Sequence, residues 1–227
     1  MGSAQEQHEP ERGESVRERL IRSTVTLLAE SGPEQLKVRT ITDAAGVSTI
    51  AVYHHFGGLK ELLQDVVAHG YSELAAAMTA AAQADPDPGV QLFAMALSTR
   101  SVAQSNAHLY DMMFGLSTRG TYRYVESPVQ NTARGFAIAY AALADACGRL
   151  LQSGRVSVID SDQIAAELWS VVHGFVTLEM AGHFDHFADP VSMVLRPMAV
   201  NHFVGMGDER AKAESSADRA MLWWSQQ

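Results

Sequence analysis

The sequence has little of what secreted or membrane-spanning proteins need. Its 227 residues include one cysteine, Cys147, so no disulfide can form within the chain, and a lone thiol fits a reducing compartment. The longest apolar stretch, residues 164–180, is interrupted by Glu167, His173 and Glu179, so it does not predict a membrane span. The first residues are polar and charged, without the apolar run of a signal peptide. We therefore expect a cytoplasmic protein with no membrane partner.

Proline and strand-like patterns are also scarce. The chain holds 7 prolines, and alanine-rich stretches with helical spacing dominate over alternating apolar and polar residues. These features predict an all-α fold, and the length allows one or two domains. We expect Cys147 to be a small buried residue on its helix, with a redox sensor as the alternative.

The chain lacks an excess of positive charge. Its formal net charge is −9, which argues against a protein that coats nucleic acid without regard to sequence. Residues 15–60 nevertheless hold 6 of the 17 basic residues and 4 of the 26 acidic ones, so this stretch is mildly positive. A weakly basic segment on an acidic chain is compatible with site-specific binding of DNA and weak affinity for other sequences, but the charge alone does not predict a DNA-binding protein.

The stretch from Thr40 to Phe56 predicts two short helices joined by a tight turn. Thr40 is expected to cap the first helix, and Gly46 to end it with a positive φ angle. Ser48 is expected to cap the second helix, which continues through Val52. Two helices joined by a short glycine-containing turn form a helix-turn-helix, whose second helix can enter a DNA major groove.

Residues 44–63, A-A-G-V-S-T-I-A-V-Y-H-H-F-G-G-L-K-E-L-L, resemble the DNA-binding signature of the TetR family of transcriptional repressors. The resemblance extends over about residues 16–67, with a fainter echo beyond. It implies a homodimeric repressor that a small-molecule ligand releases from a palindromic DNA operator. The chain departs from the family pattern at Thr42, where alanine is common, and at Leu59, where a lysine is usual and Lys60 follows.

Changes in composition and the positions of glycine and proline predict four parts of the chain. Residues 1–14 are acidic and polar and are expected to be a disordered tail; residues 15–60 form the helix-turn-helix domain. Residues 61–206 form a larger helical domain for ligand binding and dimerisation, as the resemblance implies. Residues 207–227 are either a closing helix or a loose tail. Expected helices run from Ser15 to Gly32-Pro33 and over residues 59–83, 89–103, 106–114, 121–152, 161–183 and 190–206, with Ser105 and Asp160 as N-caps and Gly115 and Gly154 as stops.

The second helix of the helix-turn-helix is expected to touch DNA. Thr49, Ile50 and Ser48 lie at its N-terminal end, where base edges are reached, and a Thr or Ile methyl can pack against thymine. Arg39 is a candidate for a bidentate contact to guanine, with a phosphate contact or a free surface position as the alternatives. The resemblance implies phosphate contacts from two further positions. The full candidate set is Arg39, Thr40, Ser48, Thr49, Ile50, Tyr53, His54, His55 and Lys60, in which the resemblance points to Tyr53 and His55 for phosphate.

Aromatic and methionine side chains recur on the inward positions of the later helices. They suit a fairly large, apolar small molecule, although any single one of them is more often ordinary core. His173 and Tyr140 could add polar contacts, and Arg100 could pair with an acidic ligand group. The candidate ligand-binding residues are Phe93, Leu97, Tyr110, Met113, Phe114, Phe136, Tyr140, Trp169 and His173.

The expected helix from Ile164 to His183 is apolar around much of its circumference. One stripe follows Ile164, Leu168, Val171, Phe175 and Leu178, so the helix must be covered on two sides. The segment L-W-S-V-V-H-G-F also resembles a C-terminal class of TetR proteins with a Trp-His-Gly pattern, which implies that the last long helices pair with those of a second copy. A helix buried within a monomer is the alternative.

Two other functions fit parts of the sequence. An all-helical enzyme is the first, but no nucleophile elbow, phosphate loop, H-E-x-x-H motif or paired carboxylates support it. A metal-responsive regulator is the second, because His183 and His186 have ligand-compatible spacing, with Asp185 or Asp189 nearby. We predict no enzyme activity, no metal and no cofactor.

Overall fold

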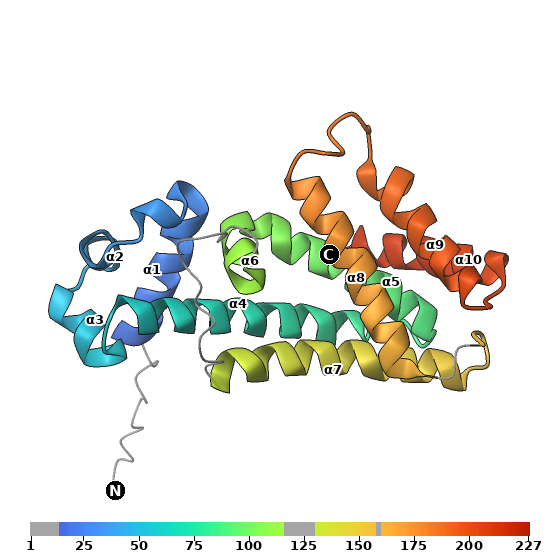
Figure 1. Ribbon diagram of the computed structural model, residues 1–227, viewed down its shortest axis with the longest axis horizontal. Helices are drawn as coiled ribbons and strands as arrows, with labels where there is room; N and C mark the ends of the chain where they lie inside the picture. Colours follow the sequence, from blue (N-terminus) through green and yellow to red (C-terminus); the bar gives the residue numbers. More distant parts are fainter. Residues whose placement is uncertain (1–13, 116–129, 158–159) are drawn as a thin grey trace, which may run out of the picture. The chain divides into compact units, whose positions relative to one another are not determined.

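The computed structural model describes residues 14–115, 130–157 and 160–227, and its regular elements there are all helices (Figure 1). The predicted all-α fold is confirmed. Residues 1–13 of the expected tail at 1–14, and the first part of the expected helix at 121–152, lie outside the described residues. Contacts divide the chain into two compact units, residues 1–62 and 63–227, which we call the head and the body.

Three short helices and the start of a fourth form the head. Its elements are α1 (Val16–Ser31), a single 3-10 turn (Pro33–Gln35), α2 (Val38–Ala45), α3 (Thr49–Phe56) and the first residues of α4 (Leu59–Ala81). Ser15 and Glu18 form a reciprocal capping box at the start of α1, with the Glu18 N–H donating to Ser15 Oγ over 3.2 Å. Leu20, Ile41 and Val52 are fully buried and join the three helices.

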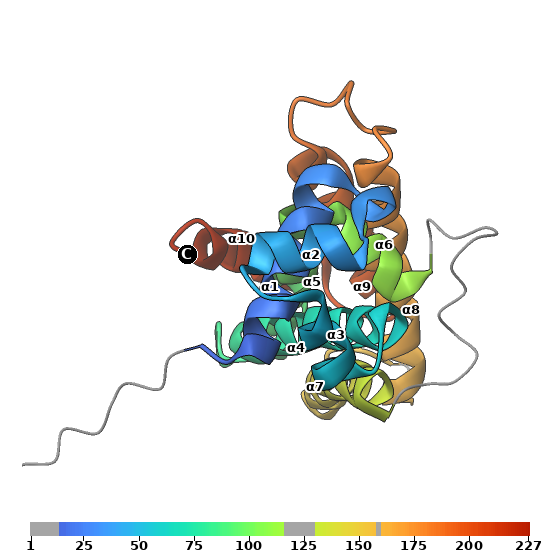
Figure 2. The same cartoon turned by 90° about the vertical axis from the view of Figure 1, so that its left-hand side faces the viewer.

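The helix-turn-helix is confirmed, and its turn depends on one glycine (Figure 2). Gly46 adopts φ 63° and ψ 39°, a left-handed conformation that residues with a Cβ rarely take. The Gly46 and Val47 N–H groups donate to the last carbonyls of α2, that of Val47 to Thr42 over 3.0 Å. Ser48 stands at the N-cap of α3 as predicted, but its side chain accepts no hydrogen bond there.

The prediction that Thr40 caps α2 is wrong. The helix begins at Val38, with Lys37 at the N-cap, and Thr40 is already inside the first turn. The Thr40 hydroxyl donates to the Gln35 carbonyl over 2.8 Å and accepts from the Lys37 N–H over 3.3 Å. The 3-10 turn before α2 therefore supplies a hydrogen-bond partner for Thr40, and the helix begins at Val38, before the predicted cap residue.

The body contains the rest of α4 and six further α-helices among its described residues. They are α5 (Pro88–Ser105), α6 (Ala107–Phe114), α7 (Gln130–Gln152), α8 (Ser161–Met180), α9 (Arg196–Gly205) and α10 (Arg210–Trp224), with a π-helical turn (Val191–Leu195) before α9 (Figure 1). α5 is buried along most of its length, since α7, α8 and α10 all pack against it. Asn106, not Ser105, caps α6: its side chain accepts the Leu109 N–H over 3.0 Å.

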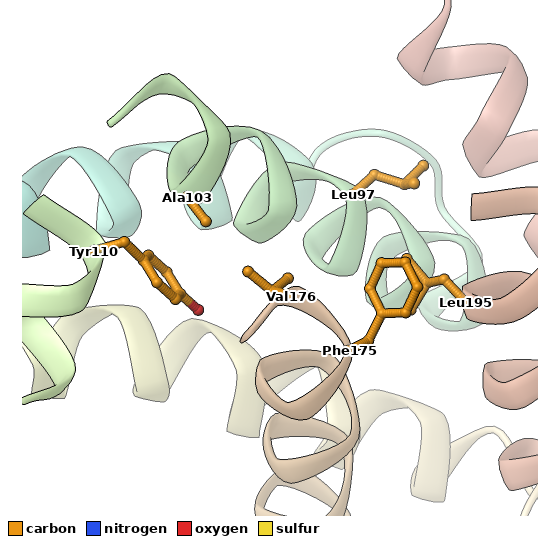
Figure 3. Close-up of a cluster of buried hydrophobic side chains, with 6 residues drawn as sticks. All are labelled: Leu97, Ala103, Tyr110, Phe175, Val176 and Leu195. Carbon is orange, nitrogen blue, oxygen red and sulfur yellow. The ribbon is translucent and has the colours of Figure 1, made fainter. Parts of the chain in front are cut away.

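Residues 207–227, for which the sequence predicts either a closing helix or a loose tail, contain the last helix of the body, α10. It packs against α5 and α9 through Ala213, Ala217 and Ala220, which are buried and small enough for close helix approach. Residues of α5, α6, α8 and the π-helical turn form a buried apolar cluster (Figure 3), and Trp224, which is partly buried, packs against it. The segment is therefore a packed helix rather than a loose tail.

Loops of the body are tied together by an ion-pair network around Arg155. Its side chain is 11% exposed and donates to Asp87 over 2.6 Å and to Asp208 over 2.5 Å. The side chain of Asp208 is 1% exposed, so its carboxylate is shielded from water and is paired with the guanidinium instead. The Ser216 hydroxyl also donates to Asp87 over 3.1 Å. The network joins the segments before α5, after α7 and before α10.

None of the helices within the described ranges combines the length and apolar character needed to cross a membrane. Cys147 is fully buried, as predicted. Burial raises the pKa of its thiol to about 12, so the thiol stays protonated and unreactive at neutral pH.

Candidate functional site

The N-terminal half of α3 presents exposed side chains on a helix that is anchored from its other side. Val52 is fully buried against the head, whereas Ile50 is 73% exposed and Tyr53 is 60% exposed. Ser48 and Thr49 are exposed as well. An apolar side chain that is exposed to solvent does not stabilise the fold by burial, and the surface around Ile50 is therefore suited to contact with another molecule.

Arg39 projects from α2 almost free of the protein. Its side chain is 89% exposed, and its nearest acidic partner is Asp43, 73% exposed, at 3.9 Å from Nε. Such a pair contributes little at a solvated surface, about 0.3–0.5 kcal/mol. The guanidinium therefore remains available for a phosphate or a base edge.

The other predicted DNA contacts differ in how available they are. His54, His55 and Lys60 are exposed, and the two imidazole rings lie edge to face with centroids 4.9 Å apart. Thr40 is partly buried, and its hydroxyl is engaged with the 3-10 turn, so it is a poor candidate for contact. Lys37 is a candidate that the sequence interpretation passed over. It is exposed at the N-cap of α2, where a lysine can contact phosphate, but the sequence interpretation began this helix at Thr40 and so did not place Lys37 at a helix start.

Two other arginines of the head have partners within it. Arg22 donates to both carboxylate oxygens of Glu14, over 2.7 and 2.9 Å. The Arg17 guanidinium lies 5.3 Å from the centroid of the Phe56 ring, which ties α1 to the end of α3.

A cluster of seven rings occupies the region where α4, α6, α7 and α8 meet in the body. Phe114 lies centrally, with its ring centroid 4.7 Å from that of Tyr110 and 4.5 Å from that of His173. The rings belong to Tyr71, Tyr110, Phe114, Phe136, Tyr140, Trp169 and His173. Six of these were predicted ligand-binding residues, and Tyr71, on the alanine-rich part of α4, was not recognised.

Two of the three tyrosine hydroxyls in this ring cluster form hydrogen bonds with neighbouring groups. Tyr110 Oη lies 2.9 Å from His173 Nδ1, and the Tyr71 hydroxyl donates to the Met113 carbonyl over 2.6 Å. Burial lowers the pKa of His173, which keeps its imidazole neutral at pH 7, and burial raises the pKa of Tyr71 to about 12. The cluster therefore offers apolar faces with neutral hydrogen-bonding groups, an environment for an uncharged molecule.

A small apolar cavity lies beside the ring cluster and shares Trp169 with it. Its volume is about 20 Å³, room for about one water molecule. The lining residues are Met78, Leu92, Phe93, Met95, Ala96, Thr99, Leu143, Leu168, Trp169, Val171, Val172, Ala199 and Phe203. Among the lining residues only Thr99 and Trp169 carry a polar side-chain group, and the hydroxyl of Thr99 donates to the Met95 carbonyl.

The cavity and the ring cluster hold most of the predicted ligand residues. Phe93 and Trp169 line the cavity, whereas Leu97 lies outside both, in the buried apolar cluster shown in Figure 3. Arg100 donates to both carboxylate oxygens of Glu179, over 2.7 and 2.8 Å, so it serves the packing of α5 on α8. The idea that Arg100 awaits an acidic ligand group is not supported by this pairing.

In the described parts of the chain, no three His, Cys, Asp or Glu side chains lie close enough together to hold a metal ion.

Family comparisons match both units of the chain. Residues 20–66 match a family described as bacterial regulatory proteins of the tetR family, and residues 92–201 match one described as a tetracyclin repressor-like C-terminal domain. Comparison with curated proteins gives no match.

Solved structures with the same fold are numerous. A protein of unknown function from Rhodococcus sp. RHA1 is 22% identical with a TM-score of 0.74, covering 88% of this chain and 100% of its own. RolR in complex with resorcinol is 18% identical with a TM-score of 0.62, covering 90% and 93%. FadR from Bacillus subtilis in complex with stearoyl-CoA is 17% identical with a TM-score of 0.59, covering 73% and 88%.

Proposed function

Since the chain belongs to the TetR family of DNA-binding transcriptional regulators, we propose that it is a homodimeric repressor which a small molecule releases from a palindromic operator. The observation that carries the proposal is the N-terminal end of α3, where Ile50 and Tyr53 are exposed while Val52 anchors the helix. Two such helices related by a twofold axis read two half-sites, and joint binding multiplies their affinities.

The exposed residues of the head have complementary roles in this proposal. Ser48, Thr49 and Ile50 face base edges in the major groove. Tyr53 and Lys60 contact phosphates at the edge of that groove. His54, His55 and the newly recognised Lys37 extend the same phosphate contacts, and Arg39 binds either a guanine or a phosphate. We do not include Thr40 among these contacts, since its hydroxyl is used inside the head.

Replacing Tyr53 by phenylalanine tests the phosphate contacts. The change keeps the ring but removes a hydroxyl that donates to a charged oxygen, so we expect a loss of about 1.5–3 kcal/mol per half-site. Fluorescence anisotropy with a labelled operator duplex at fixed salt measures the effect. Tyr140→Phe is the matched control, because it removes a hydroxyl from α7 of the body. Equal affinity of the Tyr53→Phe variant and the unaltered protein would refute this role for Tyr53.

We assign dimerisation to the exposed face of α8. Ala166, Ser170, Gly174 and Leu178 follow one another at four-residue spacing, and all are exposed, with Leu178 at 44%. Three small residues allow close approach of a second helix, and Leu178 supplies apolar area to bury. Leu178 was expected to continue a buried stripe, and its exposure beside buried Phe175 supports an intermolecular contact instead.

Gly174→Glu tests the dimer. A Cβ at Gly174 would meet no atom within 4 Å, so the substitution fits the isolated body, yet its carboxylate would lie in the proposed interface. We expect a monomer by sedimentation velocity at micromolar concentration, and correspondingly weak operator binding. Gly148→Glu on α7 is the matched control, since a Cβ there also meets nothing within 4 Å. A dimer as stable as the unaltered protein would contradict the assignment.

An uncharged, largely apolar effector is proposed to bind at the ring cluster and the adjoining cavity. The neutral imidazole of His173 and the largely apolar cavity lining support this class of ligand. The free space is too small for such a molecule without movement of the surrounding helices. Because α4 continues from the head into the body, its movement can shift the population toward head positions that no longer fit the operator.

A further inference from the structure

The DNA-facing end of α3 has an unusual composition for a helix that reads bases. Residues 48–56, all of them described, contain no Arg, Lys, Asn, Gln, Asp or Glu. Those side chains make the paired hydrogen bonds that distinguish guanine, adenine and cytosine in the major groove. The first turn of α3 offers only two short hydroxyls, Ser48 and Thr49, and one large side chain, Ile50.

Ile50 is held outward by the packing of the same helix. Val52 is fully buried, and two residues of an α-helix correspond to a rotation of about 200°. Ile50 therefore points away from the core of the head, and 73% of it is exposed. The exposure of Ile50 therefore follows from its position on the face of α3 opposite to Val52.

One group on the major-groove edge matches such a side chain. Among the four bases, thymine alone presents a methyl group there, and an apolar side chain gains by covering it. We infer that Ile50 packs against the C5-methyl of a thymine in each half-site and fixes the base at that position. This inference rests on the proposed function, since it requires α3 to lie in the major groove.

Removal of a single methyl group from the DNA tests the contact. The operator is first recovered by selection from a random duplex pool, and each thymine is then replaced by deoxyuridine, which keeps all pairing and hydrogen-bonding groups. At one position we expect Kd to rise about fourfold per half-site, as for one methyl group left in water. In the Ile50→Ala variant the same substitution should have no effect. Because Ile50 is exposed, this variant is expected to fold like the unaltered protein.

Tyr53→Phe serves as the matched control: it weakens binding to all duplexes but keeps the fourfold uracil effect. A cytosine placed at the critical position should weaken binding, and 5-methylcytosine should recover part of the loss. The inference is overturned if no uracil substitution weakens binding, or if the effect persists in Ile50→Ala. Failure to recover any preferred duplex overturns the proposed function itself, and this inference with it.

Discussion

Replacing Arg155 by methionine is expected to lower the free energy of unfolding of the body by about 3–5 kcal/mol. The substitution keeps most of the side-chain volume but leaves Asp208, which is 1% exposed, without its cation. Asp87 loses the same partner, and the segments before α5 and before α10 lose the group that joins them. Urea denaturation followed by far-UV circular dichroism measures the change.

Arg196→Met is the matched control for this prediction. Arg196 pairs with Asp218, whose side chain is 64% exposed, so we expect a loss of at most about 1 kcal/mol. Adding Asp208→Asn to Arg155→Met should recover part of the loss, since it removes the unpaired buried charge. Equal effects of the Arg155 and Arg196 substitutions would show that burial of the network has no energetic consequence.

Replacing Arg39 by alanine is expected to weaken operator binding by about 1–3 kcal/mol per half-site, so the loss doubles for a dimer on two half-sites. The side chain is 89% exposed and makes one distant ion pair, so its loss leaves the head intact. Anisotropy titrations against the selected operator and against randomised DNA measure the change. Arg149→Ala, on α7 of the body, removes the same charge and should leave affinity unchanged.

The pattern of the Arg39 effect separates its two possible contacts. A guanine contact predicts that discrimination at one G·C pair disappears while affinity for randomised DNA is retained. A phosphate contact predicts uniform weakening and a salt dependence reduced by about one ion per half-site. Unaltered affinity on every duplex would remove Arg39 from the interface.

The head could be predicted from sequence because its determinants are local. Gly46 ends α2, and the alternation of buried and exposed residues on α3 follows from helical periodicity around Val52. Thr40 was misjudged because a 3-10 turn upstream, centred on Glu34, provides hydrogen-bond partners that no capping rule anticipates. The sequence interpretation did not include Lys37 because its role as a DNA contact depends on where α2 begins.

The body was less accessible to sequence reasoning because its determinants are distant in the chain. Arg155 meets Asp87 and Asp208 across 68 and 53 residues, a pairing that no spacing rule predicts. α10 docks through alanines, which carry little amphipathic signal. Residue type identified six rings of the cluster, but it could not tell that Trp169 alone among them also borders the cavity.

Selection of bound duplexes from a random pool by the full-length protein tests the central claim most directly. The account predicts a palindrome whose half-sites lie about 34 Å apart, one turn of DNA, with a thymine that Ile50→Ala no longer requires. Recovery of no preferred sequence, or of a single half-site without symmetry, would contradict a paired reading of the major groove by α3.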